Sequence, residues 1–127
     1  MNYSLPAKNY IQNEINSKTL NDNPHKIIFD VLNELKHNLI LLSYCLENKN
    51  SKDNVKSKSF SKSLKAIYIL QSSLNMKAGG EIAENLFKLY DFCRTTIIKS
   101  FTRQEHEEIK KLIPIISEIL DGWDSIK

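Results

Sequence analysis

Apolar residues recur at intervals of three and four over long stretches of this chain of 127 residues, with few residues that would interrupt a helix. Between residues 27 and 46 they fill an arc of roughly 140° when each residue advances a helix by 100°. Three glycines and three prolines are too few for a sheet of many hairpins. The pattern therefore predicts an all-α fold. The arc consists of Ile27, Ile28, Val31, Leu32, Leu35, Leu39, Leu42 and Leu46.

Helix signals divide the chain into a polar N-terminal arm or short cap helix, residues 1–22, and a helical domain, residues 23–127. Asn23 followed by Pro24 is a typical helix start, because the asparagine side chain accepts a free backbone N–H and proline lacks one. The second helix is expected from about residue 54 to 75, and Gly79-Gly80 ends the periodic pattern. The third begins at about Glu81.

The fourth helix is expected directly after Thr102, because residues 102–105 have the spacing of a capping box. Pro114 lies inside it and is expected to kink or loosen it, since proline removes one backbone hydrogen bond. Short connections between long helices favour antiparallel neighbours. We therefore predict an antiparallel up-down four-helix bundle.

Composition narrows the class of protein. The chain has no secretory signal pattern and no apolar run of membrane-spanning length, so we expect a cytoplasmic protein without membrane insertion. A net charge of +3 gives no indication of a nucleic-acid partner. Cys45 and Cys93 lack the spacing of a zinc site and lie in apolar helical patterns, so we expect buried, reduced thiols.

No residue pattern indicates catalysis. Glu34 and His37 form a single Glu-x-x-His pair, whereas a di-iron site in a bundle needs two. His25, His37 and His106 fall at polar positions where we expect them to be solvated, and none has the spacing from arginine that helical ribonucleases show. We predict no enzyme activity, no metal and no cofactor.

Two of the expected helices carry more apolar surface than one bundle stripe needs. Phe29, Ile40 and Tyr44 lie outside the main arc of the first helix, within roughly 60° of one another, and the third helix is apolar over roughly half its circumference. The N-terminal arm, a second copy of the chain or a foreign amphipathic helix would each cover such surface. Central packing within the bundle is an equally good explanation.

One segment carries a specific resemblance. Its motifs are Gly79-Gly80-Glu81-Ile82-Ala83, Asn85-Leu86 and Leu89-Tyr90-Asp91-Phe92, which together resemble the signature of the flagellin export chaperone family, FliS. Asn23-Pro24 is similar to the family's Ser-Pro helix start, and Trp123 to its C-terminal tryptophan. The chain differs at Val31-Leu32-Asn33-Glu34, where the family often has Leu-Tyr-Asp-Gly.

The resemblance implies a cytoplasmic helical bundle that binds the C-terminal segment of flagellin, blocks premature polymerisation and passes its client to the flagellar export gate, a type III secretion system. Together with the surplus apolar surface it predicts two client-binding patches and a removable plug from the N-terminal arm. A self-associating bundle, or an adaptor for another amphipathic helix, is the alternative, and the sequence leaves monomer or weak homodimer open. The first patch is Ile82, Ala83, Leu86, Phe87 and Tyr90, the second is Phe29, Ile40 and Tyr44, and the plug is Tyr10 with Ile11.

Overall fold

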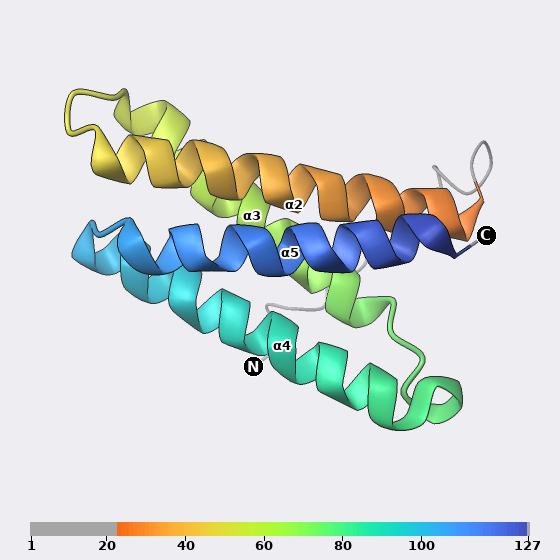
Figure 1. The fold of residues 1–127 in the computed structure, drawn as a ribbon. Coiled ribbons are helices and arrows are strands. Elements are labelled where there is room, and N and C mark those ends of the chain that lie inside the picture. Colours follow the sequence, from red (N-terminus) through yellow and green to blue (C-terminus); the bar gives the residue numbers. More distant parts are fainter. Residues whose placement is uncertain (1–22, 127) are drawn as a thin grey trace, which may run out of the picture.

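A computed structural model describes residues 23–126. In this part of the chain four helices follow one another without a strand, which confirms the predicted all-α fold (Figure 1). They are α2 (Pro24–Glu47), α3 (Asp53–Ser72), α4 (Met76–Arg103) and α5 (Glu107–Ser125).

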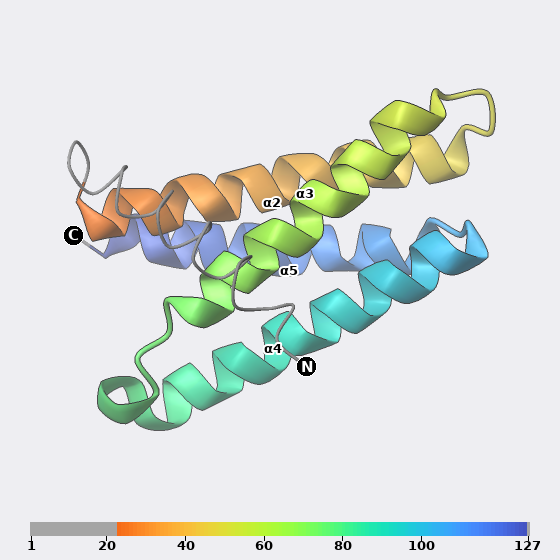
Figure 2. The ribbon, with the colours of Figure 1, turned by 180° about the vertical axis from the view of Figure 1, so that it is seen from behind.

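Successive helices run in opposite directions, so the arrangement is an up-down bundle (Figures 1 and 2). Helix α2 packs against α3 and α5, and α4 packs against the same two helices. In both views α2 and α5 lie side by side along their lengths, whereas α4 diverges from α5 toward its own N-terminal end. The predicted bundle is confirmed, with one helix held less closely than the others.

The core is centred on α2, whose apolar arc faces the other helices. Leu32, Leu35, Leu39 and Leu42 have no exposed surface. Each such side chain contributes about 1.5–3 kcal/mol by leaving water. Both cysteines are buried free thiols, as predicted. The partners of α2 in the core include Ile67, Leu70, Tyr90, Cys93, Ile97, Ile109, Leu112 and Ile116.

The start of α2 also follows the prediction. The Asn23 side chain accepts a hydrogen bond from the backbone N–H of Lys26 at 2.7 Å, and Pro24 occupies the first helical turn. A local signal that needs no tertiary contact is thus sufficient to place this helix end.

Gly80 interrupts α4 near its beginning. Its backbone has φ 53° and ψ −128°, a conformation that residues with a Cβ rarely adopt. One helical turn, 76–79, precedes it, and the Asn75 side chain caps this turn by accepting the Ala78 N–H at 3.0 Å. The expected break at the glycine pair is confirmed, and the continuous part of α4 begins at Glu81.

The predicted capping box is wrong. Thr102 lies inside the last turn of α4, and the helix ends at Arg103, followed by the cap residue Gln104, whose left-handed backbone has φ 56°. In the same turn, the Phe101 ring stacks on Phe60 of α3, with ring centroids 3.9 Å apart. Helix α5 therefore begins at Glu107, later than expected.

Two lysines, one from the α2–α3 connection and one from α3, hold the turn between α4 and α5. The Lys49 ammonium donates to the Gln104 carbonyl at 2.8 Å, and the Lys56 ammonium donates to the Gln104 side-chain oxygen at 2.6 Å. These bonds stabilise a left-handed conformation that a residue with a side chain otherwise disfavours.

Pro114 lies within α5, which continues on both sides of it. The proline is exposed, while Leu112 and Ile116 on either side of it are buried. Proline provides no N–H for the carbonyl four residues earlier. Because this part of the helix faces solvent, water supplies the missing donor. No helix in residues 23–126 combines the length and apolarity that crossing a membrane requires.

Candidate binding surface

Helix α4 presents large apolar side chains to solvent. The exposed fractions are 73% for Ile82, 43% for Phe87, 55% for Phe92 and 42% for Ile98. Before Tyr90, Ala83 is the one residue of α4 that is buried. The N-terminal half of the helix therefore leaves much of its apolar arc uncovered by residues 23–126.

The residues predicted for the first patch divide between this surface and the core. Ile82 and Phe87 are exposed, Leu86 is half-buried against the core, and Ala83 and Tyr90 are buried. Burial raises the pKa of the Tyr90 hydroxyl to about 12. Tyr90 belongs to the core and attaches α4 to the bundle, whereas Ala83 lies close to Gly79, in the turn before the kink.

The exposed residues lie on two flanks of α4. Phe87 is on the α3 side, because it lies fourteen residues, close to four helical turns, before Phe101, whose ring stacks on Phe60 of α3. The Gln71 side chain of α3 also donates to the Phe87 carbonyl at 3.0 Å. Phe92 is on the α5 side, where it lines a cavity of about 410 Å³ together with Glu108 of α5. Sequence reasoning did not select Phe92 as a site residue. The signal that could have found it is its position about 200° around the helix from Tyr90, which turns a large apolar side chain away from the buried stripe.

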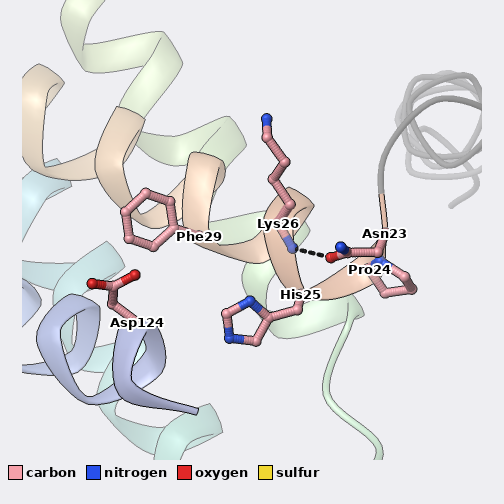
Figure 3. A pocket seen from close by; sticks show the side chains of 6 residues that line it. All are labelled: Asn23, Pro24, His25, Lys26, Phe29 and Asp124. Atoms are coloured by element: carbon pink, nitrogen blue, oxygen red, sulfur yellow. Dashed lines mark hydrogen bonds between the residues drawn. The ribbon is translucent and has the colours of Figure 1, made fainter. Parts of the chain in front are cut away.

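The second predicted patch does not form one exposed surface. Ile40 and Tyr44 on α2 are exposed by 47% and 57%, and Asn48 donates to the Tyr44 hydroxyl at 3.2 Å. Phe29 is half-buried and packs against the core. Its ring lines a separate pocket of about 500 Å³ beside Asp124 (Figure 3).

Two of the three histidines have cross-helix partners instead of being solvated, which corrects the prediction. His25 lines the same pocket (Figure 3), and its Nε2 lies 2.8 Å from the Trp123 carbonyl. Because a carbonyl only accepts, Nε2 carries a hydrogen. His106 Nε2 lies 3.5 Å from the Glu47 carboxylate. Such partners come from another helix, so helical periodicity along one segment does not reveal them.

Glu47, the last residue of α2, interacts with two residues at the start of α5, His106 and Lys110. Lys110 donates to Glu47 at 2.9 Å, and this hydrogen bond, with the charge of the lysine, lowers the pKa of the Glu47 carboxyl. Within residues 23–126 no group of three or more histidine, cysteine, aspartate or glutamate side chains is placed to hold a metal. The predicted plug, Tyr10 and Ile11, lies outside the described residues.

The chain is thus a small up-down helical-bundle protein, in which one helix, α4, exposes large apolar side chains. Residues 6–127 match the family model described as flagellar protein FliS, so the chain belongs to the FliS family. This is a family of chaperones and not of enzymes.

Similar proteins carry the same description. The chain is 32% identical to the flagellar secretion chaperone FliS of Vibrio cholerae, over 99% of this chain and 90% of that protein. It is 27% identical to the flagellar secretion chaperone FliS of Salmonella typhimurium, over 94% and 87% of the two chains. It is 25% identical to the flagellar secretion chaperone FliSB of Pseudomonas aeruginosa, over 98% of each. The resemblance noted in the sequence is thus confirmed over almost the whole chain.

Proposed function

We propose that this protein is a cytoplasmic chaperone specific for flagellin, which binds the C-terminal helical segment of its client, prevents premature polymerisation and assists export. Membership of the FliS family supports a flagellar secretion client. The observation that carries the proposal is the uncovered apolar surface of α4, formed by Ile82, Phe87, Phe92 and Ile98.

An amphipathic helix laid along α4 is the chemically matching occupant, because it buries apolar side chains on both partners. Each large side chain that leaves water contributes about 1.5–3 kcal/mol before the cost of ordering the client is subtracted. Ile82 and Phe87 meet the client directly, and Leu86 forms the edge of the contact. Tyr90 holds α4 against the core beneath them, and Ala83 is buried close to Gly79 at the start of the helix.

Ile40 and Tyr44 supply a second, smaller contact for a client that wraps around the bundle. Phe29 contributes from the separate pocket beside Asp124. Tyr10 and Ile11 act as the plug that the client displaces. The loaded chaperone then meets the flagellar export gate.

Isothermal titration calorimetry with the C-terminal flagellin segment of the same organism tests the proposal. We expect saturable heat with one segment bound per chaperone, and none with a central flagellin segment of equal length. No heat at high micromolar concentrations of the C-terminal segment would reject flagellin as the client. Sedimentation at several protein concentrations tests the alternative, since a tight dimer that the segment does not perturb would favour a self-associating bundle.

A further inference from the structure

One face of α4 changes from apolar to cationic along the helix. Ile82, Leu89, Thr96 and Arg103 are spaced by seven residues, which is close to two helical turns, so they form one line. Phe92 and Lys99 form the neighbouring line with the same spacing. The N-terminal half of this face is therefore apolar and its C-terminal half carries two positive charges.

The cationic half faces α5. Lys99 and Arg103 line the cavity of about 410 Å³ between α4 and α5, together with Phe92. Glu105 of the α4–α5 turn and Glu108 of α5 line it from the other side. The Glu108 carboxylate accepts a hydrogen bond from Lys111 at 3.0 Å. Among residues 23–126, neither Lys99 nor Arg103 forms an ion pair.

An apolar helix covering the full length of this face would take two unpaired cations out of water, which is unfavourable. A carboxylate on the occupant at this position would pair with them and remove that cost. Apolar side chains suit the other half of the face. The occupant that fits the whole face is therefore a helix with apolar residues at one end and acidic residues at the other.

We propose that Lys99 and Arg103 bind acidic side chains at one end of the client helix and so set the direction in which it lies in the α4–α5 groove. The inference rests on the proposed function and adds a polar determinant of orientation to it. The apolar turns of the client helix lie against Ile82, Leu89 and Phe92, and its acidic turn lies beside the α4–α5 connection. Phe87, on the α3 side, contacts a part of the client outside this helix.

Calorimetry with the full-length chaperone and the C-terminal flagellin segment tests this inference. Both cations are exposed, so the reversal K99E/R103E should fold normally, which circular dichroism checks. Loss of one of these exposed charges, in K99Q or R103Q, should weaken binding about twofold to fivefold, and the double reversal, which also adds repulsion, by more than about tenfold. The matched control K58E/K62E changes the net charge equally on exposed lysines of α3 and should change affinity less than about twofold.

A second comparison identifies the charge on the client. A segment whose acidic residues are replaced by lysine should bind K99E/R103E more tightly than it binds the wild type. Raising the salt concentration from about 50 to about 500 mM should reduce the difference between K99E/R103E and wild type, because salt screens exposed charges.

The two proposals fail in different ways. If the wild type binds the segment and K99E/R103E binds it as tightly as K58E/K62E does, this inference is wrong and the proposed function stands. If folded wild-type protein does not bind the segment at any salt concentration, flagellin is not the client and both are wrong.

Discussion

His25 and Trp123, 98 positions apart in the chain, exchange two hydrogen bonds across the bundle. His25 Nε2 donates to the Trp123 carbonyl at 2.8 Å, and Trp123 Nε1 donates to the His25 carbonyl at 2.9 Å. Their rings stack with centroids 5.0 Å apart and planes 12° from parallel. The pair joins the first turn of α2 to the last turn of α5, at the end of the bundle from which α4 diverges (Figure 1).

Replacing Trp123 by phenylalanine should lower the free energy of unfolding by about 1 kcal/mol, because the ring stays largely in place but the donor to the His25 carbonyl is lost. Trp123→Ala should cost about 2–4 kcal/mol by removing the packing as well. Urea unfolding followed by far-ultraviolet circular dichroism measures both, since Trp123 is the chain's single tryptophan and its fluorescence disappears in the variants. An unchanged midpoint in Trp123→Phe would contradict a stabilising role for this hydrogen bond.

Gly80→Ala should destabilise the protein by about 1–3 kcal/mol, because φ 53° with ψ −128° strains any residue that has a Cβ. Gly122→Ala is the matched control. Gly122 lies inside α5, and a Cβ built there meets no atom within 4 Å. The control should stabilise the protein by about 0.5–1 kcal/mol by favouring the helix. Thermal unfolding of the two variants should therefore shift in opposite directions, and a shared direction would argue against backbone strain at Gly80.

Stability should fall at alkaline pH because of two buried groups. Burial raises the pKa of Tyr90 from 10.0 to about 12 and that of Cys93 from 9.0 to about 11. A raised acid pKa in the folded state means that the unfolded chain loses its proton first. The stabilisation that protonated Tyr90 and Cys93 contribute to the folded state is therefore complete below about pH 9, and it is lost as the pH rises toward 12.

Tyr90→Phe isolates the tyrosine contribution, because it removes the ionising group and keeps the buried ring. We expect its free energy of unfolding to fall less steeply than that of the wild type between about pH 10 and 12. Urea titrations at a series of pH values measure this slope, and Tyr44→Phe, at an exposed tyrosine, should follow the wild type. Identical slopes in Tyr90→Phe and wild type would contradict the raised pKa.

Substituting two pairs of exposed apolar residues distinguishes the proposed main client contact on α4 from the second contact on α2. Ile82→Ser with Phe92→Ser on α4 should weaken binding of the C-terminal flagellin segment by at least about tenfold, since two large side chains lose their buried contact. Ile40→Ser with Tyr44→Ser on α2 should weaken it by a smaller factor. Because all four residues are exposed, unfolding free energies should stay within about 0.5 kcal/mol per substitution. A larger loss of affinity in the α2 double variant than in the α4 double variant would show that the main client contact lies on α2.

The sequence alone determined the helices, their order and the family. Helical periodicity, the Asn23-Pro24 start and the break at Gly80 are properties of neighbouring residues, so they are visible without tertiary contacts. Predictions failed where a partner on a distant helix decides the local structure. Thr102 lies in the last turn of α4, where the neighbouring Phe101 stacks on Phe60 of α3, and His25 has a partner 98 positions away.

Only the tertiary structure decided which part of the apolar surface is covered. Ile82 and Ser100 lie eighteen positions apart, about five full turns, so they point in the same direction from the axis of α4. Yet the isoleucine is 73% exposed and the serine 5% exposed. Periodicity fixes the direction of a side chain around its own helix but not the distance to the next helix. Because α4 diverges from α5 toward its N-terminus (Figure 2), the same face is buried at Ser100 and open at Ile82.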